Sequence, residues 1–268
     1  MKWLSGLFIG LMLWTFTAHS EVISLHVPFV VDAPKQNYFY HELLSTAIQD
    51  AGHTPKLTIK KIPHLRAKNM LESGKVSILW MVESKQRNQE FIPIEVGLTN
   101  GLIGNRILFI KQGDQPLYDK VKTLDDFRQL NLMAGLGKGW FDGRVWKENN
   151  LSYKENYGNW TSIFKMIMAG RDYHYFPRGL NEIMVEARQF PELSVEKKLV
   201  LIYDRDFRFY LSKEGPNAGK KYQDILSSVM NKAKQSGLID RLIRKYWGND
   251  FDALNYDQRQ KIYLETPK

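Results

Sequence analysis

The sequence contains no cysteine among its 268 residues. Disulfide-stabilised scaffolds, thiolate metal sites and cysteine nucleophiles are therefore excluded. Histidine is also scarce: the five histidines beyond position 20 form no H-x₃-H pair and have no acidic cluster beside them. We therefore expect neither a metal site nor a cofactor, and the fold has to be stabilised by its hydrophobic core.

Common catalytic motifs are missing as well. The Gly-rich turn GLGKG at 135–139 lacks the spacing of a nucleotide-binding P-loop, and no G-x-S-x-G nucleophile elbow occurs. Glu83 and His64 are the only candidates for a general acid or base, and nothing in the sequence pairs them. We therefore expect a protein that is not an enzyme.

Long apolar runs are absent beyond residue 20. The first residues, MKWLSGLFIGLMLWTFTAHS, combine Lys2 with an apolar run of about 15 residues and a small-x-small motif at 18–20. A membrane-spanning helix needs about 20 apolar residues. The pattern therefore predicts a signal peptide over 1–20, cleaved after Ser20.

Acidic residues are outnumbered by basic ones, and the formal net charge is +9 at pH 7. Removal of Lys2 with the signal peptide would lower it to +8. The basic residues are scattered, with no run longer than the KK pairs at 60–61, 197–198 and 220–221. Together with export, this argues against a nucleic-acid partner and favours a solvated basic surface, with which a concave anion site is compatible.

Strand-like and helix-like stretches alternate along the chain. Apolar patterning predicts strands at 22–27, 56–60, 77–82, 106–110, 130–134, 172–176, 199–203 and 208–211. Helices are predicted at 40–51, after Pro63, from Thr123, from Trp140, at 160–169, from Pro177 to Gln189, at 222–235 and at 238–246. Two successive β-α-β cycles predict two α/β lobes, with ligand contacts just after the carboxyl ends of the strands.

Four segments together resemble the periplasmic solute-binding proteins of the amino-acid type, the family 3 extracellular solute-binding proteins. They are MLESGKVSILWMVESKQRNQEF (70–91), GNRILFIKQGDQPLYDKVKTLDDFRQLNLMAGLGKG (104–139), AGRDYHYFP (169–177) and MNKAKQSGLIDRLIRKYWG (230–248). The resemblance implies a two-lobed α/β periplasmic-binding-protein fold of type II, with mainly parallel sheets flanked by helices and two crossovers. It places 21–107 plus 206–268 in lobe 1 and 108–205 in lobe 2.

The resemblance also suggests ligand-binding residues. Arg87 matches the family's carboxylate-clamping arginine if a two-residue gap is accepted, and a guanidinium suits that task. Arg178 falls where the family has an aspartate that binds an α-amino group. Arg178, Lys138 in the Gly-rich turn and the following helix N-terminus would form an anion pocket. The other expected ligand-binding residues, each of which also fits a structural or surface role, are Trp80, Trp140, His64, Phe29 and Phe176.

By this resemblance the protein captures a small anionic or carboxylate-bearing solute through lobe closure, in the periplasm, for an ABC importer of the inner membrane. Presentation of the ligand to a membrane sensor is the alternative. A dehydratase-like enzyme on the same scaffold is less favoured. The expected partners are a small-molecule ligand and the membrane protein, and the expected oligomeric state is a monomer.

Overall fold

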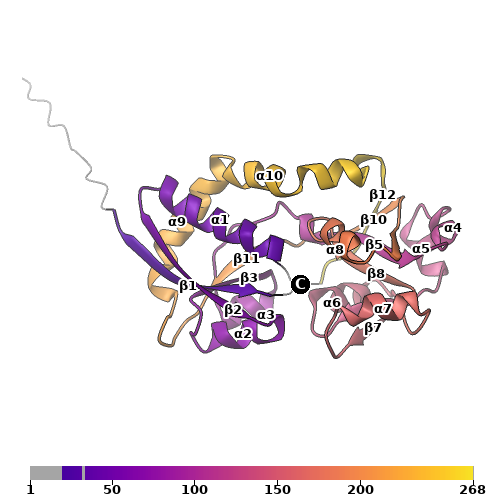
Figure 1. Ribbon diagram of the computed structural model, residues 1–268, viewed down its shortest axis with the longest axis horizontal. Helices are drawn as coiled ribbons and strands as arrows, with labels where there is room; N and C mark the ends of the chain where they lie inside the picture. The colour runs from indigo at the N-terminus through magenta and orange to yellow at the C-terminus, as the bar shows by residue number, and fades with distance from the viewer. Residues whose placement is uncertain (1–19, 32–33, 268) are drawn as a thin grey trace, which may run out of the picture.

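The protein is described by a computed structural model that covers residues 20–31 and 34–267 (Figure 1). The predicted signal peptide lies outside these residues, except for Ser20. The described residues form two lobes side by side, with helix α10 running along both of them. No helix in the described part is long and apolar enough to cross a membrane.

The first lobe is built on two small sheets. Strand β1 pairs in parallel with β2, while β3 and β4 flank β11 in antiparallel pairs. The backbone N–H of Ser77, just before β3, donates to the carbonyl oxygen of His26 in β1 at 2.7 Å and so links the two sheets. The elements of this lobe are β1 (Val22–Val30), α1 (Pro34–Asp50), β2 (Thr54–Ile62), α2 (His64–Glu72), β3 (Ile78–Val82), α3 (Lys85–Glu90), β4 (Ile92–Pro93), β11 (Phe207–Leu211), η2 (Lys220–Tyr222), α9 (Gln223–Gln235) and most of α10 (Leu238–Ala253).

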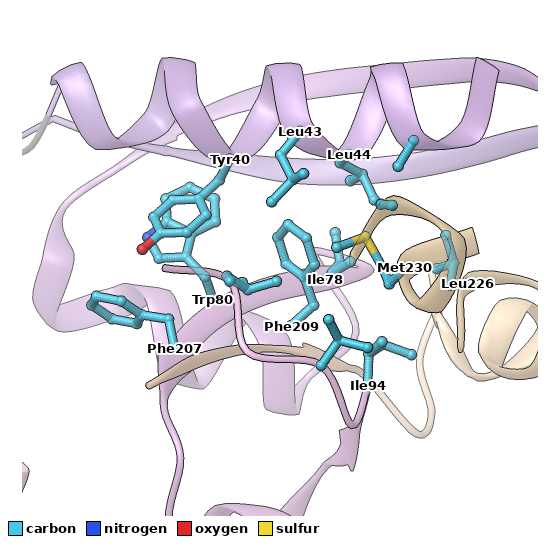
Figure 2. Close-up of a cluster of buried hydrophobic side chains, with 14 of the residues drawn as sticks. Tyr40, Leu43, Leu44, Ile78, Trp80, Ile94, Phe207, Phe209, Leu226 and Met230 are labelled. Carbon is cyan, nitrogen blue, oxygen red and sulfur yellow. The ribbon is translucent and has the colours of Figure 1, made fainter. Parts of the chain in front are cut away.

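The core of the first lobe lies between α1, the β3–β11 pair and α9 (Figure 2). Tyr40 of α1 stacks on Trp80 of β3 with ring centroids 4.6 Å apart, and both side chains are buried. Leu43 and Leu44 follow Tyr40 on the same helix face and approach Phe209 and Met230. The helical spacing of these residues explains why α1 packs against the sheet.

The second lobe contains one sheet with the order β12-β10-β5-β8-β6-β7, and β9 pairs with β5. Strands β10–β12, β6–β7 and β6–β8 pair in parallel, and the pairs of β5 are antiparallel. The elements are η1 (Leu102–Gly104), β5 (Asn105–Lys111), α4 (Gln115–Tyr118), α5 (Leu124–Gln129), β6 (Ala134–Gly137), α6 (Phe141–Glu148), β7 (Tyr153–Asn156), α7 (Ser162–Met168), β8 (Tyr175–Gly179), α8 (Ile183–Gln189), β9 (Leu193–Val195), β10 (Leu199–Ile202), η3 (Tyr256–Gln258) and β12 (Gln260–Tyr263). The expected α/β fold, with parallel-rich sheets flanked by helices, is confirmed.

The chain passes between the lobes before β5 and after β10, as the two expected crossovers require. A hydrogen bond joins these two connections. The carboxylate of Asp206, after β10, accepts the backbone N–H of Thr99, before β5, at 3.1 Å. A third connection runs from α10 to β12, which pairs with β10 in the second sheet. The expected lobe boundaries remain a prediction, and the sheet order adds β12 as a strand of the second sheet.

Two predicted strands are displaced along the chain. The strand expected at 130–134 is β6 at 134–137, and the one expected at 172–176 is β8 at 175–179. Asn131 and Asp172 have φ angles of 49° and 59°, in the left-handed region, where a β-strand cannot continue. By contrast, the helix start predicted at Thr123 is confirmed as a capping box with Asp126.

Candidate functional site

A cavity of about 230 Å³ lies between the two lobes. From the first lobe its wall includes Val30, Lys35, Gln36, His64, Ala67, Lys68, Leu79, Trp80, Met81, Val82, Arg87 and Phe207. From η1 and the second lobe it includes Ile103, Arg106, Trp140, Phe141, Asp142, Trp160, Arg178, Asn181, Glu182, Val185, Glu186 and Gln189. Aromatic and apolar side chains line it together with several charged groups that can orient a small molecule.

Within the described ranges, Arg87 is the cation of the first lobe's wall that forms no ion pair with an acidic residue. Helix α3 positions it, because the Ser84 hydroxyl caps the helix by accepting the backbone N–H of Arg87. Its guanidinium donates to the carbonyl oxygen of Val82, and no ion pair involves it within the described part of the chain. The acids on either side have other partners: Glu83 pairs with Arg205 at 3.1 Å, and Glu90 with Lys68 at 2.7 Å.

Burial lowers the pKa of Arg87 from its ordinary value, because the half-buried guanidinium has lost part of its hydration. An arginine stays protonated in proteins all the same. An anionic group that enters the cavity would therefore find a partly dehydrated cation with donors still to satisfy. This is the chemistry that suits a carboxylate.

Arg178, in contrast, is already paired within the protein. It lies in β8 with 5% of its surface exposed. Its Nε and a terminal nitrogen donate to the two carboxylate oxygens of Glu186 at 2.7 and 2.6 Å, and Glu182 lies 3.2 Å away. The guanidinium also lies over the rings of Trp160, Trp140 and Phe176, 4.7 to 5.1 Å from their centroids.

Arg106 of β5 makes a second buried ion pair in the same wall. It donates to Asp142 at 2.7 Å and to the hydroxyl of Tyr203 at 2.8 Å, and it lies 3.4 Å from Glu182. Glu182 therefore stands between two guanidiniums, each of which has a closer carboxylate of its own. The wall of the second lobe thus holds three carboxylates for two arginines, and the group of five carries one negative charge in excess.

The pKa values of the two glutamates shift in opposite directions. Burial disfavours the ionised form of Glu182, but Arg178 and Arg106 outweigh burial and hold its pKa below the ordinary value. Burial raises the pKa of Glu186, and its ion pair with Arg178 offsets this only in part. Of these two glutamates, Glu182 is the one that stays ionised more firmly.

The expected site residues lie as follows. Trp80, Trp140, His64, Arg87 and Arg178 line the cavity. Phe176 is fully buried and stacks on Trp140, with centroids 5.9 Å apart, so it lies behind the wall. Phe29 packs edge-on against Tyr38 at 5.7 Å and is not part of the cavity wall.

Lys138 is exposed, and its ammonium lies 4.4 Å from the ring centroid of Tyr157, away from the cavity wall. The structure therefore does not bring Lys138 to Arg178. Nor does Arg178 stand between a strand and a helix start, because it lies inside β8, and α8 begins five residues later. The cause is the shifted start of β8 after Asp172.

Several residues of the wall were not predicted from the sequence. They are Gln36, Arg106, Asp142, Trp160, Glu182 and Glu186. Glu182 directly precedes α8 and Glu186 lies in its first turn, and a spacing of four residues brings two side chains to the same side of a helix. Arg106 and Asp142 gave no such signal, because only the tertiary fold brings them together. Within the described residues, no group of histidine, aspartate and glutamate side chains has the arrangement to hold a metal ion.

No known protein-family model and no curated protein matches the sequence. Solved structures do match the fold. An ancestral arginine-binding protein bound to glutamine gives a TM-score of 0.61 at 14% identity, over 84% of this chain and 98% of that chain. An amino acid ABC transporter substrate-binding protein from Streptococcus pneumoniae bound to L-arginine gives 0.58 at 15% identity, over 86% and 95%.

A periplasmic binding protein of Salmonella typhimurium with high arginine specificity gives a TM-score of 0.56 at 11% identity, over 85% of this chain and 99% of that chain. At such identities the likeness shows the fold. The structures that this chain resembles are amino-acid-binding proteins of the kind predicted from the sequence, and those named here are binding proteins rather than enzymes.

Proposed function

We propose that the protein binds a small amino acid, or another solute with both a carboxylate and a cationic group, in the cavity between its lobes. The observation that carries the proposal is the opposite charge of the two walls. Among the residues that the structure describes, Arg87 on the first lobe has no carboxylate partner, while the second lobe holds three carboxylates for two arginines. A zwitterion satisfies both walls at once.

This proposal narrows the expectation of an anionic or carboxylate-bearing solute, because it adds a cationic group to the carboxylate. That expectation relied on Arg178 as an available cation, but Glu186 and Glu182 already neutralise it. By the family resemblance, Arg178 stands in the place of an aspartate that binds an α-amino group. Glu182, four residues later, supplies a carboxylate in the same wall.

We further propose that the bound solute is delivered to an ABC importer from the periplasm. The similar structures include a substrate-binding protein of an amino acid ABC transporter and a protein called periplasmic. Contacts from both walls would favour the closed arrangement of the lobes, which is how a solute drives closure. We propose no reaction, because Glu83 is paired with Arg205 and does not belong to the wall that contains His64.

Titration calorimetry on the purified mature protein tests the proposal. The ligands are L-arginine, L-glutamine and L-glutamate, with acetate, phosphate and butylamine as compounds that carry only one of the two charges. We expect at least one amino acid to bind and none of the three simple ions to do so. Substitution Arg87→Ala should weaken binding by about 10- to 100-fold, because a charge-assisted hydrogen bond contributes about 1.5–3 kcal/mol.

Arg66→Ala is the matched control, since Arg66 is exposed on α2 and lies outside the cavity wall. It should leave the affinity unchanged. Binding of acetate or phosphate without any binding of amino acids would contradict the proposal and restore the anionic alternative. Equal effects of Arg87→Ala and Arg66→Ala would remove Arg87 from the site.

A further inference from the structure

A hydrogen bond between two side chains of the cavity wall joins the first lobe to the second. Gln36, in the first turn of α1, donates from Nε2 to Oε1 of Glu182, just before α8, at 2.8 Å. Helix α1 belongs to the first lobe, where it packs on β1, β2 and α9. Glu182 belongs to the second lobe, where its other oxygen accepts the backbone N–H of Gly179 at 3.0 Å.

Among the carboxylates of the second lobe's wall, Glu182 is the one to which a hydrogen bond from the first lobe contributes the most free energy. Arg178 and Arg106 each have a closer carboxylate, in Glu186 and Asp142, and approach Glu182 only at 3.2 and 3.4 Å. The excess negative charge of the wall therefore rests on Glu182, whose side chain is 9% exposed. A hydrogen bond to a buried, charged acceptor is stronger than one between neutral groups.

A second polar contact runs beside the first. Lys35, the neighbour of Gln36 on α1, pairs with Asp250 of α10 at 2.9 Å, and Arg188 of α8 approaches the other oxygen of Asp250 at 3.4 Å. Asp250 thus links the start of α1 to α8. The first turn of α1 therefore contacts the second lobe's helix at two points, directly through Gln36 and indirectly through Lys35.

We propose that the Gln36–Glu182 bond is a latch that holds the lobes closed in the absence of a solute. Gln36 is neutral, so it satisfies the excess charge of Glu182 only through one hydrogen bond. The latch is weak enough for the lobes to reopen. The charge of residue 36 then sets the ratio of closed to open molecules in the absence of a solute.

The chain contains no cysteine, so introduced cysteines can be labelled specifically to test this proposal. Lys75→Cys in the first lobe and Lys165→Cys in the second are at exposed positions and give two unique sites for spin or dye labels. The distance between the labels is measured by pulsed EPR or single-molecule energy transfer in the absence of any added solute. The result therefore does not depend on which solute binds, or on whether one does.

We expect the closed fraction to fall in the order Gln36→Lys, wild type, Gln36→Leu, Gln36→Glu. Lysine would form an ion pair with Glu182, leucine would remove the bond, and glutamate would place two carboxylates together. The closed-to-open ratio should change by about tenfold or more between wild type and Gln36→Leu. Closure in Gln36→Lys should weaken with added salt.

Gln86 offers a matched control, because it donates to Glu90 at 2.7 Å within α3 and does not cross the cavity. Gln86→Lys and Gln86→Glu make the same charge changes beside a glutamate and should leave the label distance unchanged. Small-angle scattering and circular dichroism on the unlabelled Gln36 variants show whether the fold is intact. A folded Gln36→Glu variant with the wild-type distance distribution would overturn the latch.

Discussion

The guanidinium of Arg178 holds the carboxylate of Glu186 by two parallel hydrogen bonds, inside a wall that faces the cavity. Both groups are buried, and three aromatic rings cover the guanidinium. A charged pair in this setting needs both of its members, because water cannot replace a missing partner. Loss of a single charged side chain from this wall of the second lobe should therefore lower the stability of the fold.

Removal of the Arg178 side chain should destabilise the protein strongly. Arg178→Ala leaves Glu186 and Glu182 buried without their closest cation, which costs about 3–5 kcal/mol in the free energy of unfolding. Urea denaturation followed by circular dichroism measures this loss. Arg188→Ala is the control, because the Arg188 side chain is 59% exposed and its pair with Asp250 is long, so its loss should have little effect. Equal losses in the two variants would contradict the burial argument.

Acidification should weaken the fold through His41. Burial lowers the pKa of His41 from its ordinary value, and a hydrogen bond between Nε2 and the carbonyl oxygen of Pro28 at 2.8 Å offsets this only in part. The unfolded chain therefore takes up a proton near pH 6.5, before the folded protein does. The stability that this neutral histidine contributes is present above pH 6.5 and is lost as the pH falls below it.

The free energy of unfolding of wild type and His41→Gln, measured by urea titration between pH 7.5 and 5, checks this sign. Glutamine can still donate to Pro28 but does not titrate. The wild type should lose more stability than the variant on acidification, because only the wild type carries the histidine. Parallel pH curves for the two proteins would assign the acid sensitivity to other groups.

A methyl group at Gly137 should disturb the cavity wall. A Cβ at this position would lie 2.3 Å from Cε2 and 2.5 Å from Nε1 of Trp140, so the indole would have to move. Gly137→Ala should cost about 1–3 kcal/mol in the free energy of unfolding, as overpacking does. It should also weaken solute binding, since Trp140 lines the cavity and covers Arg178.

Gly158→Ala serves as the comparison, because a Cβ there meets no atom within 4 Å. Gly137→Ala should cost less stability in a Trp140→Leu background than in the wild type, since leucine leaves room for the methyl group. If the double variant is no more stable than predicted from the two single changes added together, the clash is not the cause.

The alternation of strands and helices predicted most of the architecture, because each amphipathic segment carries its own periodicity. Thr123 with Asp126, and the helical spacing in α1, are local signals of this kind. The ends of β6 and β8 could not be predicted, because the left-handed angles at Asn131 and Asp172 depend on the local turns. Strand β12 was missed for a different reason: it is a short edge strand, and its pairing with β10 brings together residues about 60 positions apart.

In the candidate site, too, some features could be predicted from the sequence and others depend on the tertiary fold. Arg87, Trp80 and Trp140 were predicted from the family resemblance and from the rule that residues near strand ends meet at the cleft of an α/β fold. The partners of Arg178 were not predicted, because an ion pair depends on which two residues the fold brings together. The sequence gives the residue at each position but not these spatial contacts. The sequence predicted a positive wall on the second lobe. The structure places Glu182, Glu186 and Asp142 beside the two arginines, so the wall is negative instead.

The third connection has a mechanical consequence. After β12, the hydroxyl of Thr266 accepts the backbone N–H of Asp204, and the carbonyl oxygen of Pro267 accepts a hydrogen bond from Arg205. The C-terminal segment thus lies against the connection between β10 and β11, about which we expect the lobes to rotate. Points on a rotation axis are displaced least. A group attached to this segment would stay nearly stationary while the far ends of both lobes swing, which makes it a fixed reference from which their movement can be measured.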